Sequence, residues 1–387
     1  MKPITPIELF DLLPVKLFDD LIKTTGIDYK VQKLTGKSMF SLLLYGLLEE
    51  NRMSLRTLED TFNGSKFKFF FDIKKNLSTK FNSLSDRLSI MPVEYFAQIH
   101  QAVYERLCLY YPLEKRKKYQ INRIDSTMVC EQARKLHQGM STGRKKDGKK
   151  QIKYTLNLTD LFPSSVEVFT SQSALNEDVT MPITIYQSLA KCVDTAQDNV
   201  FVFDRGLCSN KTKEQFNNDG IWFVTRMRKS AKYEVLEDLT IPINHIKVNN
   251  LTITHYQLIK LNNTQTTFKL IRAINDEGKE LLFISNLMDE DIPTIIEIYR
   301  KRWEIEVFFR FLKQELNLSH LVAMNENGIT IILYMTMILS MLILIYKKIN
   351  QLGYKTAKRQ FKIQLDEYIT ALIVEACGGD SSKWAYG

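Results

Sequence analysis

Residues 199–206, NVFVFDRG, form a short apolar run that ends in an aspartate followed by an arginine and a glycine. An uninterrupted apolar run of this length is typical of a strand that is covered on both faces of a sheet. A second segment, residues 119–129 with the sequence YQINRIDSTMV, is rich in β-branched residues and also contains an aspartate. Asp125 therefore lies inside one predicted strand, and Asp204 lies at the carboxyl end of another.

These two aspartates stand where carboxylates are uncommon. A carboxylate in a central strand is costly unless it is paired or binds a cation. One such residue is often the partner of a buried arginine, and this alternative stays open for Asp125 and Asp204 taken singly. Two of them, on strands that the fold would place side by side, favour a site for a hard cation such as Mg²⁺ or Mn²⁺.

The segments around the two aspartates predict a mixed α/β fold. Residues 153–172 predict two strands around a turn at Leu161–Ser165, and residues 176–193 predict a helix. The strand that ends in aspartate comes next, followed by a brief helix at 211–220 and a strand at 221–228. The order of three strands, helix, strand, helix and strand predicts a meander to which the later strands are added in parallel.

The regions on either side differ from this core. Residues 1–118 carry apolar residues at helical spacing, and their 19 Lys and Arg against 14 Asp and Glu give a net charge of +5. Residues 229–287 lose the helical pattern and predict a β-rich insertion, because they are too long for a loop. Helices are expected again at about 291–317, 329–350 and 361–376.

The apolar run at 329–346 has two interpretations. It is uncharged over about 18 residues, which is close to the length that spans a membrane. It also contains Thr330, Thr336 and Ser340 and is preceded by a charged, soluble-looking body. These features favour a helix buried on most sides in the core of a large protein, with a membrane anchor as the alternative.

Composition excludes several classes of protein. The chain has 387 residues and a formal net charge of +9, which weakly favours a polyanionic partner. Its five widely spaced cysteines argue against a disulfide scaffold, and the absence of an H-x3-5-H pair argues against a zinc finger. With no recognisable signal peptide, a cytoplasmic protein is expected. The basic segments 114–118 and 141–153 are either solvated or in contact with phosphates.

The predicted helix at 291–317 carries a third acidic candidate, Glu306. At about 100° per residue, it shares one stripe of the helix with Tyr299, Arg302 and Lys313. Arg302 and Glu306 alone could be an ordinary helix-stabilising pair. A neighbouring apolar stripe is expected to dock on the sheet, and it consists of Ile298, Ile305, Phe308, Phe309, Leu312 and Leu316.

Together, the three acids suggest more than each does alone. Two strand aspartates and Glu306 can hold two metal ions about 4 Å apart, which activate a water or a 3′-hydroxyl for attack on a phosphodiester. Arg302 and Lys313 could then hold phosphates near the metal centre. Tyr299 could stack on a base or donate to a phosphate.

At this point the sequence resembles a known family. The spacing Tyr299-x2-Arg302-x3-Glu306-x6-Lys313 matches the YREK signature of transposases of the insertion-sequence 4 (IS4) family. Asp204-Arg205-Gly206 resembles the second-aspartate block of that family, and residues 124–127, IDST, resemble the first. The resemblance covers residues 119–350, and its motifs stand in the same order with a β-rich insertion before the glutamate.

The resemblance implies an RNase H-like fold whose catalytic acids are Asp125, Asp204 and Glu306, with Mg²⁺ or Mn²⁺, two ions in number, as cofactor. It implies cleavage of double-stranded DNA at terminal inverted repeats and joining of the ends to target DNA. Tyr299, Arg302 and Lys313 would contact the terminal DNA strand. A homodimer on paired ends, a nucleoid-associated cytoplasmic location and no membrane association follow from the same resemblance.

These implications assign a role to each region of the chain. The expected regions are a helical N-terminal region for DNA ends (1–118), two parts of the catalytic core (119–228 and 288–350), the β-rich insertion (229–287) and a helical tail (351–387). Three alternatives remain: an RNase H-like nuclease without strand transfer, a domesticated DNA-binding protein without catalysis, and a membrane-associated protein. The YREK arrangement argues against the first and the intact acids against the second.

Overall fold

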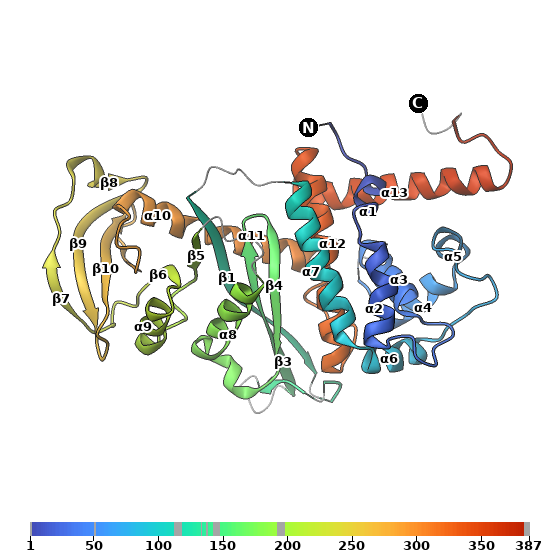
Figure 1. Cartoon of the computed structure of the whole chain (residues 1–387), viewed down its shortest axis with the longest axis horizontal. Helices are drawn as coiled ribbons and strands as arrows, with labels where there is room; N and C mark the ends of the chain where they lie inside the picture. The colour runs from blue at the N-terminus through green and yellow to red at the C-terminus, as the bar shows by residue number, and fades with distance from the viewer. Residues whose placement is uncertain are drawn as a thin grey trace. The chain divides into compact units, whose positions relative to one another are not determined.

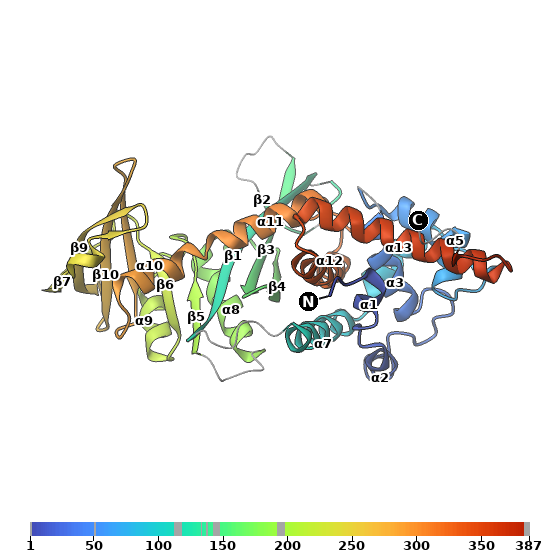
Figure 2. The same cartoon turned by 90° about the horizontal axis from the view of Figure 1, so that it is seen from above.

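The computed structural model describes residues 2–49, 52–111, 118–132, 134–136, 138–141, 148–191 and 198–382. The chain divides into two compact units (Figures 1 and 2). The first comprises Met1–Pro112, Val129–Ile152 and Phe309–Gly387, and the second comprises Leu113–Met128 and Lys153–Phe308. The boundaries of these two units differ from those of the five regions expected from the sequence. The roles of those regions remain predictions.

Strands from the first part of the predicted core and from the predicted insertion form one mixed sheet. In the described part of the chain the strand order is β2-β3-β1-β5-β6-β11-β10-β9-β7, with β4 paired to β3 and β8 paired to β9. The strands are β1 (Tyr119–Gln132), β2 (Met140–Ser141), β3 (Lys149–Thr159), β4 (Phe162–Phe169), β5 (Asp198–Val202), β6 (Trp222–Arg226), β7 (Tyr233–Asp238), β8 (Lys247–Val248), β9 (Leu251–Leu261), β10 (Thr267–Asn275) and β11 (Glu280–Ser285).

The directions of the core strands agree with the prediction. β4 runs antiparallel to β3, β5 runs parallel to β1, and β6 runs parallel to β5. The register between β1 and β5 aligns Tyr119 with Asp198 and Arg123 with Val202. A meander followed by parallel additions, with crossover helices between them, confirms the expected α/β class.

The predicted β-rich insertion continues the same sheet. β11 pairs antiparallel with β6, so that Phe283 lies opposite Arg226. β10 pairs with β11 and β9, and β9 pairs with β7, all antiparallel. The insertion therefore extends the sheet that carries Asp125 and Asp204.

Apolar residues of β5 alternate between the two faces of the sheet. Val200 and Val202 pack with the face that α10 (Ile292–Arg300) covers. Phe201 and Phe203 pack with the opposite face, which α8 (Glu177–Ala190) and α9 (Asn210–Asn218) cover. This arrangement explains the uninterrupted apolar run, since each face needs its own apolar residues.

Two details of the core differ from the sequence-based expectation. The hairpin between β3 and β4 turns at Asp160 and Leu161 rather than at Leu161–Ser165, so Pro163 lies inside β4. Asp160 takes the left-handed conformation with φ of 50°, which aspartate tolerates better than most residues. β3 also begins at Lys149, so the second half of the predicted basic loop 141–153 is strand, and residues 142–147 lie outside the described residues.

The expected single helix at 291–317 is instead two helices, α10 and α11 (Trp303–Glu315). Between them the N–H groups of Lys301 and Arg302 donate to carbonyls three residues back, at 3.2 and 3.0 Å. The guanidinium of Arg123 explains the break, because its Nε donates to the Lys301 carbonyl at 3.0 Å and it forms an ion pair with Glu304 at 2.6 Å. The six residues of the predicted apolar stripe are all buried, as expected.

The first unit is mostly helical, and the described residues up to Tyr111 are helical as the sequence led us to expect. Its helices are α1 (Pro6–Phe10), α2 (Val15–Thr25), α3 (Gly36–Glu49), α4 (Leu55–Asn63), α5 (Ser65–Phe70), α6 (Phe81–Ile90), α7 (Val93–Tyr110), α12 (Glu326–Ile349) and α13 (Tyr354–Ala376). The last of these begins earlier than the expected residue 361. Most of the basic run 114–118 lies outside the described residues.

Helix α12 is the apolar helix whose role the sequence left open. It is long and apolar enough to cross a membrane, but 89% of its most apolar stretch is buried inside the protein. It packs against α3, α6, α7 and α13. A core helix of a soluble protein has the same length, composition and burial, so α12 alone is weak support for a membrane span.

Candidate functional site

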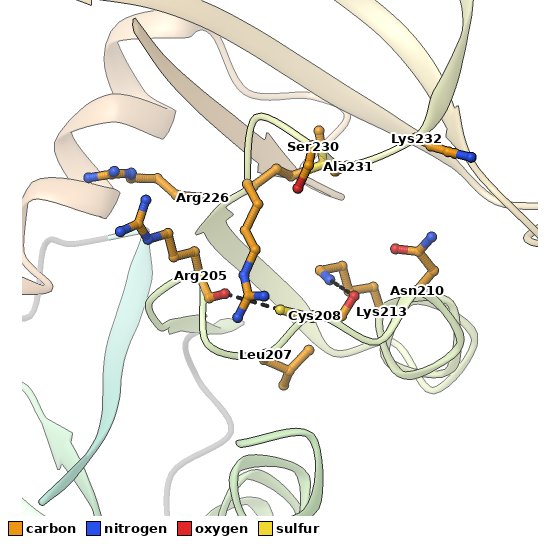
Figure 3. A pocket seen from close by; sticks show the side chains of 11 residues that line it. Arg205, Leu207, Cys208, Asn210, Lys213, Arg226, Ser230, Ala231 and Lys232 are labelled. Atoms are coloured by element: carbon orange, nitrogen blue, oxygen red, sulfur yellow. Dashed lines mark hydrogen bonds between the residues drawn. The ribbon is translucent and has the colours of Figure 1, made fainter. Parts of the chain in front are cut away.

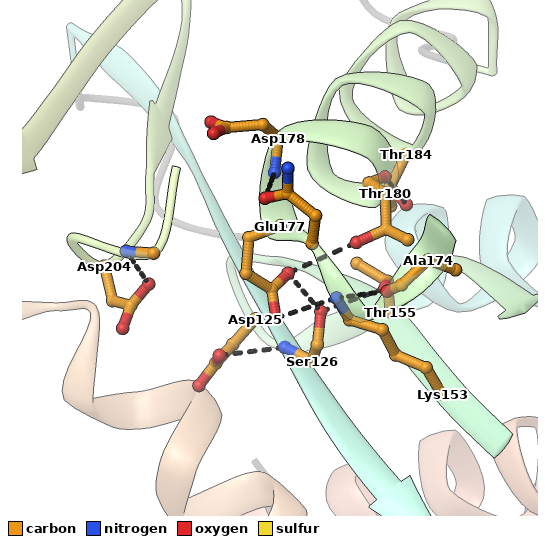
Figure 4. A network of polar contacts seen from close by, with 12 residues as sticks. Asp125, Ser126, Lys153, Thr155, Ala174, Glu177, Asp178, Thr180, Thr184 and Asp204 are labelled. Carbon is orange, nitrogen blue, oxygen red and sulfur yellow. Dashed lines mark hydrogen bonds and ion pairs between the residues drawn. The ribbon is translucent and has the colours of Figure 1, made fainter. Parts of the chain in front are cut away.

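Asp125 and Asp204 lie on the same side of the sheet, one in β1 and the other just after the neighbouring strand β5. Asp125 is in β1, two residues after Arg123, and its carboxylate Oδ1 accepts from the Ser126 N–H at 2.8 Å. Asp204 follows the end of β5, and its Oδ1 accepts from the Gly206 N–H at 2.7 Å (Figure 4). Among the described residues, no hydrogen-bond donor reaches the Oδ2 atom of either carboxylate.

The electrostatics of Asp125 show that the two carboxylates are close. The pKa of Asp125 is raised to about 7, mainly by burial, and the negative charges of Asp204 and Glu177 contribute in the same direction. The Ser126 N–H and the positive charge of Arg302 act in the opposite direction. A divalent cation binds carboxylate oxygen atoms and offsets the repulsion between two like charges. Asp125 and Asp204 therefore fit a metal site.

A buried arginine does not explain these aspartates. Arg123 lies in β1 and is only 3% exposed, yet it pairs with Glu304 rather than with either aspartate. Its Nη1 atom donates to the carbonyls of Ile121, Leu158 and Asp160. The alternative left open by the sequence, a structural ion pair with a buried arginine, therefore does not apply to Arg123 and these aspartates.

The residues of the YREK signature lie around the break between α10 and α11. Tyr299 ends α10 against Phe283, with ring centroids 5.1 Å apart, and burial raises its pKa. Arg302 lies in the break, 5.7 Å from the centroid of the Tyr299 ring, and pairs with Glu306 at 2.7 Å. Lys313 is in the last turn of α11, seven residues or about two turns after Glu306.

The structure does not join all three predicted acids into one metal centre. Within the described residues there is no group of three His, Cys, Asp or Glu side chains placed to hold a metal ion. Asp125 and Asp204 come together, whereas Glu306 is neutralised by Arg302. The positive charge of Arg302 also acts on Asp125, so the arginine lies within electrostatic reach of both.

A buried ion pair behind Asp125 escaped the sequence analysis. Lys153 in β3 is fully buried, and its Nζ pairs with Glu177 Oε1 at 2.9 Å and donates to the Ala174 carbonyl at 2.9 Å. Glu177 Oε2 accepts from the hydroxyl of Ser126 at 3.0 Å (Figure 4). Ser126 is thus held by Glu177 on its side chain while its N–H holds Asp125.

The next residue of α8 holds the segment that follows Asp204. Asp178 Oδ1 accepts from the backbone N–H groups of Cys208 at 2.7 Å and Ser209 at 2.8 Å. Gly206 lies in the same loop, where an added Cβ would be 2.8 Å from Asp204 Oδ1 and 2.9 Å from Glu177 Cγ. The start of α8 therefore supports both aspartate-bearing segments, and any side chain at the glycine of the DRG motif would have to displace Asp204 or Glu177.

The sequence offered a signal for part of this support. Lys153 interrupts an apolar strand pattern, which suggests a buried cation in need of an acidic partner. Glu177 and Asp178 carry no such signal, since acidic residues are common in the first turn of a helix. Their roles depend on contacts with residues far away in the chain.

Comparison with known proteins adds independent information. The model of the family described as "Transposase DDE domain" matches residues 116–342, more than half of the chain. A Synechocystis sp. protein described as a transposase for insertion sequence element IS4SA is 33% identical over 156 residues, or 39% of this chain and 42% of that protein. A Geobacillus stearothermophilus protein described as a transposase for insertion sequence element IS5377 is 26% identical over 139 residues, or 35% of this chain and 36% of that protein.

A solved structure supports the fold. The cryo-EM structure of the piggyBac transposase synaptic complex with hairpin DNA matches with a TM-score of 0.52 at 11% identity, covering 97% of this chain and 82% of that one. Together with the mixed sheet, this likeness confirms the predicted α/β fold with an RNase H-like core. The chain spans about two fifths of the length of the curated relatives it matches. By its match over residues 116–342, it belongs to the family of transposases with a DDE domain.

Proposed function

We propose that the chain is a DNA transposase of an insertion sequence, which cuts the ends of a DNA element and joins them to target DNA. The observation that carries the proposal is the pair of carboxylates of Asp125 in β1 and Asp204 just after the neighbouring parallel strand β5, neither of which forms an ion pair within the described residues. Membership of the DDE-domain family supports it.

The family implies a dependence on divalent metal ions, and we infer Mg²⁺ or Mn²⁺, two in number. Asp125 and Asp204 would hold the metal, and Glu306 would complete the set of ligands. Bound there, the ions would activate a water or a 3′-hydroxyl and stabilise the leaving oxygen of a phosphodiester. Arg302 is placed to exchange its partner from Glu306 to a DNA phosphate, which would free Glu306 for the metal.

The remaining residues of the signature would position the DNA end. Tyr299 lies beside Arg302 near the break between α10 and α11, with its ring largely buried against Phe283. Lys313 lies farther along α11 and would hold a second phosphate. The partners inferred for this activity are double-stranded DNA with terminal inverted repeats, target DNA and a second copy of the chain, in a cytoplasmic, nucleoid-associated setting.

The test is incubation of the purified chain with DNA that carries the inverted repeats flanking its gene, with Mg²⁺. Excision and joined products are expected, and Asp125→Ala, Asp204→Ala or Glu306→Ala should each abolish them. Asp198→Ala removes an exposed acid at the start of β5 and should leave activity unchanged, which makes it the matched control. Activity that survives any of the three substitutions would refute the assignment of that acid.

The reaction products also distinguish a transposase from the main alternative, a nuclease. A nuclease of the RNase H-like class would give cut DNA without joined products. Arg302→Ala and Lys313→Ala should impair processing of the ends while leaving the fold intact. Unchanged cleavage in both variants would exclude their contact with the DNA end.

A further inference from the structure

A cavity of about 190 Å³ beside the loop that follows Asp204 is lined by five basic residues. They come from that loop, from the start of α9, and from the end of β6 with the turn after it (Figure 3). The five are Arg205, Lys213, Arg226, Arg228 and Lys232. No acidic residue is among the described residues that line this cavity.

None of these five cations has an ion-pair partner in the described part of the chain. The neighbouring Lys229 differs, because it pairs with Glu280 at 3.4 Å and does not line the cavity. Five unpaired positive charges around one cavity repel each other, so the arrangement favours a negatively charged ligand. The cavity is therefore built for an anion rather than for an apolar molecule.

One of the cations is held in place by the fold, and a second is buried in part without a partner in the described part of the chain. Lys213 is only 4% exposed, and its Nζ donates to the carbonyls of Cys208 at 3.1 Å and Ser209 at 3.5 Å. The Nε atom of Arg226 is buried and has no hydrogen-bond partner among the described residues. A buried donor without a partner is costly, so the described residues do not satisfy the Arg226 guanidinium at this atom.

The cavity also adjoins the proposed active site. Arg205 directly follows Asp204 in the chain. The charge of Arg226 acts on Tyr299, the first residue of the YREK signature. In Figure 3 the side chains of Arg205 and Arg226 lie next to each other at one side of the cavity. An anion in the cavity would thus be close to the position where the proposed function places the cleaved DNA strand.

We propose that this cavity, named here the phosphate pocket, binds a backbone phosphate of the DNA strand that is cut, next to the phosphate at Asp204. The proposal rests on the proposed function and adds a DNA contact that lies outside the YREK signature. Arginine suits this ligand because its guanidinium donates two parallel hydrogen bonds to phosphate oxygens. The first turn of α9, which begins beside the pocket after Ser209, adds the positive end of a helix.

The test uses a double variant that combines Arg228→Gln and Lys232→Gln. Lys229→Gln is the matched control. All three positions are exposed, so the variants should fold, as thermal melting would verify. Binding to a DNA duplex carrying an element end is measured by fluorescence anisotropy across salt concentrations. The double variant should bind about tenfold more weakly and reduce the slope of log K against log salt by about 1 or more, whereas the control should not.

A second measurement identifies the group that is bound. A neutral methylphosphonate linkage is placed in turn at each position near the cleavage site. At one position it should weaken wild-type binding and have little further effect on the double variant, because both changes remove the same contact. Additive losses at every position, or equal salt slopes in the double variant and Lys229→Gln, would overturn the proposal.

Two controls separate this proposal from others. Inorganic phosphate at millimolar concentration tests whether the pocket is a small-anion site. If phosphate stabilises the wild type against thermal unfolding and element-end DNA cannot displace it, the proposal of a DNA contact is overturned. Cleavage by the wild type that is lost in Asp204→Ala shows that the proposed function holds even if the double variant binds normally. A wild type that cuts no DNA would count against the proposed function instead.

Discussion

At the scale of single residues, the buried pair of Lys153 and Glu177 makes the sharpest prediction about stability. Lys153→Met keeps the length of the side chain but leaves Glu177, whose side chain is 24% exposed, without its cation. Because loss of a hydrogen bond to a charged group costs about 1–3 kcal/mol, we expect the free energy of unfolding in urea to fall by about 2 kcal/mol. Lys149→Met, an exposed lysine of the same strand, should change it by less than about 0.5 kcal/mol.

The double variant Lys153→Met with Glu177→Gln checks the cause. If the loss comes from an uncompensated carboxylate, neutralising Glu177 should restore part of the stability. Equal stabilities of the single and double variants would show that packing, rather than charge, explains the loss.

Lys213 makes a prediction about pH. Burial lowers its pKa from the ordinary 10.5 to about 8, and the charge of Arg228 contributes in the same direction. Between these two values the unfolded chain holds a proton that the folded chain has released, so this residue makes stability rise with pH. Below about pH 8 both states are protonated and its contribution is constant.

The measurement is the free energy of unfolding in urea at pH 8 and pH 9.5, for the wild type and for Lys213→Met. The wild type should gain about 1–2 kcal/mol relative to the variant over this interval, because one unit of pKa corresponds to about 1.4 kcal/mol. Parallel pH profiles of the two proteins would show that Lys213 keeps an ordinary pKa.

At this scale the sequence pointed to residues that are unusual in their local pattern. Asp125 and Asp204 stood out because they interrupt or end apolar strands, and the structure places them together. Glu177 and Asp178 did not stand out, because an acid in the first turn of a helix is common. Their partners are 24 or more residues away, and a single sequence does not reveal such contacts.

At the scale of elements, the start of α8 explains how two strands present their aspartates at a fixed separation. Asp178 accepts from two N–H groups of the loop that follows Asp204. Asp178→Ala should loosen this loop and raise the Mg²⁺ concentration for half-maximal DNA cleavage by about tenfold, since residues that orient metal ligands affect metal affinity by about 10–100-fold.

Asp178→Asn is the matched control for this prediction. Its amide oxygen can still accept from both N–H groups, so its Mg²⁺ requirement should stay within about twofold of the wild type. A shift in the asparagine variant as large as that in the alanine variant would indicate that the charge of Asp178, rather than its hydrogen bonds, sets metal affinity.

The expected helix at 291–317 shows where periodicity stops being informative. Its apolar stripe was predicted correctly, because the 3.6-residue period continues through the break. The break itself depends on Arg123, which lies 178 residues before Lys301 in the chain and takes its carbonyl. The sequence near Lys301 does not reveal that a distant arginine binds its carbonyl. For this reason the sequence predicted one continuous helix instead of two.

At the scale of the whole molecule, α12 predicts how the chain behaves in a cell extract. Its apolar side chains are already covered by other helices of the first unit, so little apolar surface is left for lipid. The expressed chain should stay in the supernatant after membranes are sedimented. Retention in the pellet after alkaline carbonate extraction would support the membrane anchor instead.

A substitution in α12 distinguishes the same alternatives. Leu339 is fully buried, and Leu339→Asp should lower the yield of folded protein by placing a charge in the core. At Thr330, which is partly exposed on the same helix, Thr330→Asp should be tolerated. A Leu339→Asp variant that folds with the yield of the wild type would contradict the burial of this side chain in the core.

The ion pair between Lys153 and Glu177 also limits how chimeras of this protein and its relatives can be built. β3 supplies the cation and α8 supplies the acid, and each is unfavourable in the interior without the other. A chimera that takes only one of the two elements from a relative with a different pairing would inherit an orphan charge behind Asp125. Residues 149–190 should therefore be transplanted as one block, which gives crossover points for building hybrid enzymes.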